Sequence, residues 1–425
     1  MWLAFDDHGF FHLTPNSLRL TTYDSRVTVA TAVLDLDFAQ LPLEVKGLDR
    51  YSQAYILIRL RGHPVGRAWL PVTGGSVGGG NLRGALIEAA GWPLWERWLH
   101  DYLGWDERKD LKSFPEIATV AVCTRDRPAE LRRCLEAIHP WAKEGHEILV
   151  VDNCPRTELT RRLVKGYDQV RYIREDNPGL NFARNRALRE ARHKIVAFTD
   201  DDAIPEAAWL ANLLRNFNNP RTLCVTGLTM PLELETQAQE WFERYSPFGR
   251  GFMRIVYDGA NQRPAVAGRI GAGANMALRR NVLDCIGPFD ECLDGGTPTM
   301  SGGDTEIFSR ILARGYCIVY DPAALSWHCH RRTWEELVRT LYGYGVGTYA
   351  FWTRSLLIEG EWSVLKVAWN WFFHYQLRAV ARSLLKRPGS IPLHLLLAEL
   401  RGCAWGPLAY LLSRRFRSRI RAYDQ

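Results

Sequence analysis

The chain has 425 residues, a net charge of +7, 47% hydrophobic residues and 24% charged residues. This composition is that of a globular protein and excludes long disordered tracts. A chain of this length predicts two or three domains rather than one core. The nine cysteines form no Cys-x-x-Cys pair, which argues against a disulfide framework and for a reducing compartment.

The sequence predicts neither an export signal nor a membrane span. Met1–Asp7 carries acidic residues where a signal peptide carries basic ones, and no apolar run follows. The longest apolar stretches are interrupted by charged residues, namely Lys366, Arg378, Glu399 and Arg401. None of these stretches therefore has the roughly 20 uninterrupted apolar residues that a membrane span needs. We therefore expect a cytoplasmic protein, either free or attached peripherally to the cytoplasmic face of a membrane.

Residues 1–112 are predicted to form a small β-rich accessory domain. Its expected elements are strands at 18–21, 27–30 and 54–58, a glycine-rich turn at 74–80 and a helical run at 82–103. No motif in this part of the chain indicates a chemical function.

Residues 113–330 are predicted to form an α/β domain, because apolar strands alternate with helices. The expected strands are 119–123, 147–151, 170–173 and 194–199, and the expected helices are 129–143, 157–166 and 181–191. Fully apolar strands indicate a parallel sheet covered on both faces. Ligands of such sheets bind beyond the carboxyl ends of the strands.

Polar residues follow each of these four strands. They are Thr124, Arg125 and Arg127 after the first, Asp152 and Asn153 after the second, Gly179 and Arg184 after the third, and Asp200, Asp201 and Asp202 after the fourth. Any one group could be a loop that caps a helix. Four groups at one edge of a sheet predict a pocket.

The three adjacent aspartates are the most informative feature. Neighbouring carboxylates repel one another, which raises their pKa values, and a divalent cation relieves that repulsion. Oxygen ligands suit Mg²⁺ or Mn²⁺, and such a site completes its shell with water and substrate phosphates. The sequence therefore predicts Asp200 and Asp202 as ligands of a metal that binds a diphosphate. The alternative is an acidic helix N-cap before Pro205.

Two further motifs provide candidate site residues. Asp304 follows Gly302 and Gly303 at the start of a helical run, where it could accept a proton from an attacking hydroxyl or simply cap the helix. His328 lies in the sequence Trp-His-Cys-His. It could be a third ligand of the predicted metal, a partner for phosphate or a structural histidine. A zinc site is disfavoured because no second Cys or His pair has suitable spacing.

Residues 331–425 are predicted to be helical, with breaks at 388–389 and 406–407. Aromatic and basic residues mix along the expected helices, which is typical of a membrane interface; they are Trp362, Trp369, Trp371, Phe372, Phe373, Lys366, Arg378 and Arg382. Packing against the α/β domain would explain the same pattern. A basic run closes the chain at Arg414, Arg415, Arg417, Arg419 and Arg421, and it suits an anionic surface or a solvated terminus.

Together, the order and spacing of these motifs resemble the family 2 glycosyltransferases of the GT-A fold, over about residues 117–345. The resemblance implies a nucleotide-sugar site that contains Thr124, Arg125, Arg127, Asp152, Asn153, Gly179, Arg184, Asp200 and Asp201. It implies that Asp200 and Asp202, with His328 as a further candidate ligand, bind Mg²⁺ or Mn²⁺ on the donor diphosphate. It also implies that Asp304 is the general base, although the Glu that often precedes this Asp is replaced here by Gly303.

The function implied is inverting transfer of a hexose from a nucleotide-diphosphate sugar to a hydroxyl of a polysaccharide, glycolipid or lipid-linked sugar. We expect an anionic membrane surface as a further partner and no nucleic acid. A non-catalytic nucleotide-binding scaffold is the main alternative. A sugar nucleotidyltransferase is disfavoured, because the turn at 124–128 lacks the glycines of a phosphate loop.

Overall fold

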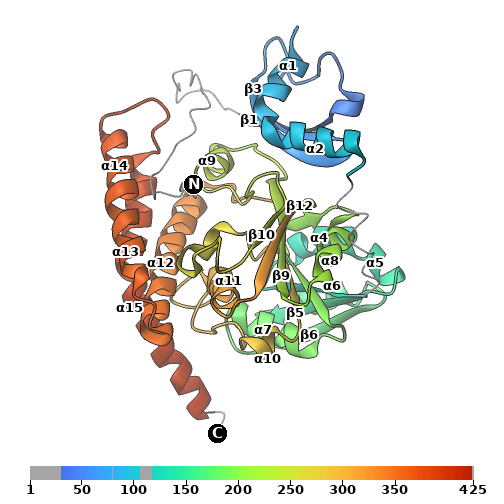
Figure 1. Cartoon of the computed structure of the whole chain (residues 1–425). Helices are drawn as coiled ribbons and strands as arrows, with labels where there is room; N and C mark the ends of the chain where they lie inside the picture. Colours follow the sequence, from blue (N-terminus) through green and yellow to red (C-terminus); the bar gives the residue numbers. More distant parts are fainter. Residues whose placement is uncertain (1–29, 79, 106–116, 424–425) are drawn as a thin grey trace.

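The computed structural model describes residues 30–78, 80–105 and 117–423. The predicted strand at 18–21, most of the one at 27–30 and the last two arginines of the basic run lie outside the residues or side chains that it describes. An N-terminal sheet lies above one end of a central α/β domain, and long C-terminal helices stand along one side of it (Figure 1). The boundaries near residues 112 and 330 stay predictions.

The N-terminal part is a three-stranded sheet covered by two helices. Its elements are β1 (Ala30–Asp37), β2 (Tyr51–Leu60), β3 (His63–Pro71), α1 (Leu82–Ala90) and α2 (Trp92–Leu103); a short 3₁₀ helix, η1 (Phe38–Gln40), follows β1. β2 is parallel to β1 and antiparallel to β3. The predicted helical run at 82–103 is confirmed as two helices, which Gly91 separates with a φ of 60°.

Strand β2 packs both of its faces, which explains its uninterrupted apolar sequence. Ala54, Ile56 and Ile58 join the core beneath α1 and α2. Tyr55 and Leu57 point the other way and share a second core with residues of the α/β domain, namely Leu228, Met230, Leu234 and Leu325. The N-terminal sheet is therefore docked onto the central domain through buried side chains.

The central sheet has nine strands in the order β10-β12-β9-β11-β7-β4-β5-β6, with β8 paired to β12. The strands are β4 (Thr119–Thr124), β5 (Glu147–Asn153), β6 (Val170–Glu175), β7 (Ile195–Asp200), β8 (Ala203–Pro205), β9 (Thr222–Pro231), β10 (Ile255–Tyr257), β11 (Asn275–Arg279) and β12 (Cys317–His328). The four strands expected from the sequence, β4 to β7, are confirmed and lie parallel.

The expectation of a wholly parallel sheet is wrong for the second half of the domain. β11 is antiparallel to both β7 and β9, and β8 and β10 are antiparallel to β12. The strand–helix alternation on which the prediction rested stops after β7, because only Asp201 and Asp202 separate β7 from β8. A connection that short cannot cross over to a parallel neighbour.

Helices cover both faces of this sheet, as predicted. They are α4 (Pro128–Ile138), α5 (Pro140–Lys143), α6 (Leu159–Val164), α7 (Leu180–Glu190), α8 (Trp209–Leu214), η2 (Arg215–Asn218), α9 (Gln237–Tyr245), η3 (Pro264–Arg269), α10 (Val282–Cys285) and α11 (Gly303–Ala313). Side chains of β4 and β5 alternate between the two cores. Val120 and Val150 pack with α4 and α8, whereas Ala121 and Leu149 pack with α7 and α11.

The C-terminal part is helical, as predicted, and consists of α12 (Trp334–Glu359), α13 (Ser363–Asn370), η4 (Trp371–Gln376), α14 (Leu377–Leu384) and α15 (Leu393–Tyr423). The predicted break at 406–407 is wrong, because both residues lie inside α15. Glycines there serve close packing instead. A Cβ on Gly402 would lie 2.1 Å from the Tyr342 carbonyl oxygen, and one on Gly406 would lie 2.6 Å from that of Val346.

Among the described residues, one helical segment, Leu393–Arg415, is long and apolar enough to cross a membrane by length and composition, with a hydropathy of 1.2. Glu399 and Arg401 lie within this segment, so charged residues interrupt it as the sequence indicated. In the most apolar 18-residue stretch of this segment, 44% is buried inside the protein. A single helix of this kind is weak evidence for a span, because the core helix of a soluble protein passes the same test.

Candidate active site

The residues predicted from the strand ends meet at one edge of the sheet. β4 lies between β7 and β5, and its last residues pair with both, Cys123 opposite Asp200 and Thr124 opposite Asp152. Parallel pairing therefore places the polar ends of three strands side by side, where ligands of α/β sheets bind.

The pairing of β12 with β8 brings His328 to the same edge. His328 lies opposite Ala203, and the backbone N–H of Cys329 donates to the Asp202 carbonyl oxygen at 2.9 Å. The His328 Nε2 atom is 3.2 Å from Asp202 Oδ1. One ligand atom from each of Asp200, Asp202 and His328 lies within 4.8 Å of the other two. Two carboxylates and an imidazole fit a divalent cation such as Mn²⁺ or Mg²⁺.

Asp201 is not part of this cluster and is hydrogen-bonded to residues at the end of β4 and the start of α4. The Thr124 hydroxyl donates to one carboxylate oxygen at 2.7 Å, and Arg127 Nη1 donates to the other at 2.5 Å. Burial and the neighbouring Asp202 carboxylate raise the pKa of Asp201 to about 7. Thr124, Arg127 and Asp201 were all predicted to contact nucleotide, and the structure shows them bonded to one another; Arg125 lies half-buried beside them.

Asp202 is surrounded by positive charge. Arg127 Nη2 donates to Asp202 Oδ2 at 2.8 Å, and Arg331 Nη1 donates to the same oxygen at 3.1 Å. Although burial opposes it, His328 and the two arginines hold the pKa of Asp202 well below its ordinary range. Burial and Asp202 raise the pKa of Asp200. The two candidate ligands therefore differ in the ease with which they become charged.

Asp152 is fully buried and only half satisfied. The Tyr172 hydroxyl donates to its Oδ2 at 3.0 Å, and its Oδ1 has no hydrogen-bond partner among the described residues. Burial raises the pKa of Asp152 to about 6. A buried acceptor without a donor is costly unless a ligand supplies one. The sequence predicted Asp152 from its place after a strand, but nothing in the pattern marked Tyr172.

Asn153 holds the loop that leads into α7. Its side-chain amide donates to the Asn177 carbonyl at 2.7 Å, and its Oδ1 accepts from the Gly179 N–H at 2.8 Å. Gly179 has a φ of 145°, which a side chain would disfavour. Asn153 and Gly179 therefore shape the floor of the site, and their polar groups are used within the protein.

Arg184 links the carboxylates at the two sides of the site. Its Nη1 donates to Asp294 Oδ2 at 2.6 Å and to Asn181 Oδ1 at 3.2 Å. Although burial opposes it, Asp294, Asp200 and Asp304 raise the pKa of Arg184. The sequence gave no signal for Asp294, because it lies in a loop without a recognisable motif.

Asp304 lies in the first turn of α11 and is partly exposed. Its Oδ2 accepts from the Gly273 N–H at 2.9 Å, and its Oδ1 accepts from the Thr305 N–H at 2.7 Å. These bonds fix the carboxylate while leaving it accessible. The bond from the Thr305 N–H is a contact within the first turn of α11, as the helix-capping interpretation expects. The bond from the Gly273 N–H joins Asp304 to the segment before β11.

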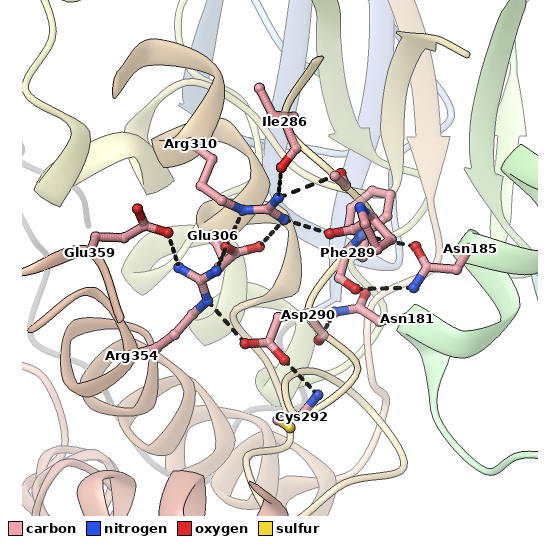
Figure 2. A network of polar contacts seen from close by, with 12 residues as sticks. Asn181, Asn185, Ile286, Phe289, Asp290, Cys292, Glu306, Arg310, Arg354 and Glu359 are labelled. Atoms are coloured by element: carbon pink, nitrogen blue, oxygen red, sulfur yellow. Dashed lines mark hydrogen bonds and ion pairs between the residues drawn. The ribbon is translucent and has the colours of Figure 1, made fainter. Parts of the chain in front are cut away.

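A buried ionic network supports α11 from behind (Figure 2). Arg310 donates to the Pro288 carbonyl at 2.7 Å and to Glu306 at 2.8 Å. Arg354 of α12 binds Glu306 at 3.0 Å and Asp290 at 2.9 Å. The C-terminal helices therefore hold the helix that carries Asp304. The sequence analysis missed this network, since its members lie in segments with no motif.

The side chains of the Trp-His-Cys-His motif do not converge as zinc ligands. Cys329 points to Glu233, with Sγ 3.7 Å from its carboxylate. His330 Nδ1 is 3.0 Å from His328 Nδ1, and His330 Nε2 is 3.2 Å from Glu243. Burial lowers the pKa of His330. His328 alone of the motif faces the aspartates.

Residues 119–287 match the family described as Glycosyl transferase family 2. The middle of this chain belongs to that family. The match covers β4 to α10, and thus includes the three aspartates but neither Asp304 nor His328. The α/β core described above is therefore of the GT-A type, as the resemblance implied.

Two relatives with assigned names are similar to this chain. Glycosyltransferase AglE of Haloferax volcanii is 25% identical over 246 residues, which cover 56% of this chain and 74% of that protein. The pre-mycofactocin glycosyltransferase of Mycobacterium tuberculosis is 25% identical over 235 residues, which cover 53% of this chain but only 46% of that protein. Among solved structures, the mannosyltransferase PcManGT of Pyrobaculum calidifontis aligns with a TM-score of 0.46 at 18% identity, over 75% of this chain and 96% of that one.

The raised pKa of Asp152 predicts a pH-dependent stability. Its folded pKa of about 6 exceeds the ordinary value of 3.8, so the folded state binds this proton more tightly than the unfolded chain does. The charged carboxylate therefore opposes folding above pH 6, and this opposition fades as the pH falls from 6 toward 4. We expect Asp152→Asn to be more stable than wild type at pH 8, by up to about 3 kcal/mol. Urea unfolding should show this advantage shrinking at pH 5; a difference that is the same at both pH values would contradict burial as its cause.

Proposed function

We propose that this chain is an inverting, metal-dependent glycosyltransferase that moves a hexose from a nucleotide-diphosphate donor to a hydroxyl acceptor. The observation that carries the proposal is the clustering of Asp200, Asp202 and His328 at the edge of a family 2 domain, with Arg184 between this cluster and Asp304. The family match supports the reaction class. The geometry supports the roles of the residues.

The nucleotide would bind over the ends of β4 and β5. Asp152 Oδ1 is the buried acceptor that needs a donor there, and an N–H of a nucleobase edge has the right chemistry. Thr124, Arg127 and Asp201 form the adjoining wall, and Gly179 allows the chain at the start of α7 to approach closely. Helix α7 begins directly after Gly179, and the N-terminus of a helix is a favourable binding site for a phosphate group.

The residues that would hold Mg²⁺ or Mn²⁺ are Asp200, Asp202 and His328. When bound, the ion would neutralise the negative charge that builds on the departing diphosphate. Arg127 and Arg331 already contact Asp202 and are placed to contribute positive charge at the same edge. Arg184 stabilises the ionised state of Asp200 and of Asp294.

Asp304 would accept the proton of the acceptor hydroxyl as that oxygen attacks the anomeric carbon. A single base and a single displacement, with the leaving diphosphate on the opposite face of the sugar, invert the anomeric configuration. The two backbone N–H bonds to Asp304 orient the carboxylate without neutralising it. No second carboxylate is required for this chemistry.

We further propose that the protein attaches peripherally to the cytoplasmic face of a membrane and uses a membrane-linked or polysaccharide acceptor. A stripe of apolar side chains is exposed along α13, η4 and α14: Trp362, Leu365, Trp369, Phe373, Leu377, Leu384 and Leu385. Basic residues flank this stripe at Lys366, Arg378, Arg382, Lys386 and Arg387. Exposed aromatic and basic side chains together fit an anionic lipid surface. Other residues of the same helices pack on α12 and α15, so the alternative of simple packing accounts for one face only.

The donor site can be tested by calorimetry with UDP, GDP and dTDP, each with Mn²⁺ or Mg²⁺ and without metal. We expect micromolar binding of one nucleotide that requires the metal and is lost in Asp202→Ala, because Asp202 would help to hold the ion that neutralises the diphosphate. The exposed Glu136→Gln variant serves as a charge control. Absence of binding by all three nucleotides would remove the donor assignment, and metal-independent binding without turnover would favour the scaffold alternative.

Asp304→Asn should retain donor binding and lose turnover by about 10²- to 10⁴-fold, because the amide keeps the two backbone hydrogen bonds but cannot accept the proton. Sugar transfer, or hydrolysis of the donor if no acceptor is known, provides the rate. A variant with wild-type turnover and normal donor affinity would show that another group is the base.

Flotation with vesicles that contain phosphatidylserine tests the membrane proposal. The double variant Trp362→Ala/Trp369→Ala, at positions that are 70% and 62% exposed, should float less than wild type. Raising the salt concentration should weaken the binding of wild type, since the basic flank contributes. Trp92→Ala/Trp105→Ala, with 62% and 63% exposure on another part of the molecule, is the matched control. Equal flotation of both double variants and wild type would rule out the α13–α14 stripe.

A further inference from the structure

A continuous chain of buried hydrogen bonds connects the N-terminal sheet to His328. The Tyr55 hydroxyl of β2 donates to Glu243 Oε1 at 2.6 Å, and Arg67 Nη1 of β3 donates to the same oxygen at 3.0 Å. The other oxygen of Glu243 is 3.2 Å from His330 Nε2, and His330 Nδ1 is 3.0 Å from His328 Nδ1. His328 Nε2 then faces Asp202.

The chemistry of these groups fixes the position of each proton. A carboxylate only accepts, so Glu243 must receive its bond from a protonated Nε2 of His330. Arg67 already provides the positive charge that balances Glu243, so His330 need not be a cation. A neutral His330 then has an unprotonated Nδ1, which accepts the proton of His328 Nδ1. The Nδ1 atom of His328 is therefore engaged with His330, and Nε2 is the ring nitrogen that faces the aspartates and that a metal ion would bind in place of a proton.

Packing holds the two imidazoles in this arrangement. The ring of Phe248 meets His328 edge-on at 4.9 Å between centroids, and Phe242 contacts His330 at 4.5 Å. Phe242 and Glu243 are neighbours on α9, whose start is fixed by a capping box between Thr236 and Gln239. Apolar rings on both sides exclude water, which strengthens the hydrogen bonds between the buried polar groups.

We propose that Glu243 and His330 are positioning residues for His328 and that Tyr55 and Arg67 complete this arrangement from the N-terminal domain. Histidine ligands of metals depend on the partner of their second nitrogen for tautomer and ring orientation. The N-terminal domain thus takes part in the candidate metal centre, although none of its described residues is in the cluster of candidate ligands. This inference rests on the proposed function, since it assigns His328 to a divalent cation.

The same domain interface contains a natural control. Arg50 and Tyr51 of the N-terminal part both bind Glu235, at 3.0 Å and 2.9 Å. An arginine and a tyrosine of the N-terminal part thus bind a glutamate here, as they do at Glu243 in the same interface. The described hydrogen bonds of the Glu235 carboxylate do not lead to a histidine ring; only its backbone N–H reaches the His330 carbonyl, through Gln239. Substitutions in this second triad change the domain contact without changing the connection to His328.

The test measures the affinity for Mn²⁺ by electron paramagnetic resonance, in the presence of a saturating concentration of the nucleoside diphosphate that binds most tightly. Loss of an outer-shell partner typically weakens metal binding by at least tenfold, so we expect Glu243→Gln to bind Mn²⁺ about tenfold more weakly than wild type. Tyr55→Phe should shift the affinity in the same direction by less. Glu235→Gln and Tyr51→Phe should retain the wild-type affinity, with all four variants checked for their thermal unfolding midpoint.

Nitrogen-15 chemical shifts of labelled histidines in the metal-free protein supply a readout that stability alone does not move. We expect His330 to carry its proton on Nε2 and His328 to carry one on Nδ1, with His328→Gln and His330→Gln used for assignment. A proton on His330 Nδ1, or equal Mn²⁺ affinity in Glu243→Gln and Glu235→Gln, would overturn the inference. If wild type itself binds no Mn²⁺, the proposed function fails first; a proton on His330 Nε2 would then still confirm the hydrogen-bond chain.

Discussion

The repulsion among buried carboxylates at the end of β7 is the constraint around which this protein is organised. Asp200, Asp201 and Asp202 lie within three consecutive residues, and the last two are buried. Like charges brought together out of water raise one another's pKa values and oppose folding. The fold offsets this repulsion with hydrogen-bonding or positively charged partners around each acid. Thr124 and Arg127 bind Asp201, Arg127 and Arg331 bind Asp202, and Arg184 lies near Asp200.

The residues that shape the candidate site come from all three parts of the chain. Arg127 and Arg184 belong to the α/β core, His328 is the last residue of β12, and Arg331 follows that strand. Arg354 of α12 fixes the helix of Asp304, and Tyr55 and Arg67 of the N-terminal sheet reach His330 through Glu243. The N-terminal sheet and the C-terminal helices are therefore two additions to the family 2 domain that support its candidate site from behind. The segments outside the family match shape the candidate site as well as the surface.

The sequence predicted most of the site because its residues follow strands of one sheet, and the ends of parallel strands must meet. Asp152, Asp200 and Asp202 lie where that rule placed them, and pairing between β8 and β12 adds His328. This rule does not predict site residues that come from loops or from helices distant in the sequence. Asp294, Tyr172 and Glu243 have no local pattern that marks them, since their importance depends on tertiary contacts alone. The antiparallel pairs in the sheet were missed for a related reason, because the two residues between β7 and β8 carry no periodic signal.

The docking of the N-terminal sheet also sets an order of assembly. Tyr55 is 188 residues from Glu243 along the chain, and the apolar face around it packs against strands as late as β12. During synthesis, that face must stay uncovered until most of the central sheet has emerged and folded, since contacts between distant segments form late. The N-terminal sheet is thus synthesised before the central sheet but docks onto it only after the central sheet has folded. A defect in β9 or β12 would leave the apolar face of β2 around Tyr55 exposed, where it could self-associate. Correct folding of the central sheet therefore also determines the solubility of the N-terminal sheet.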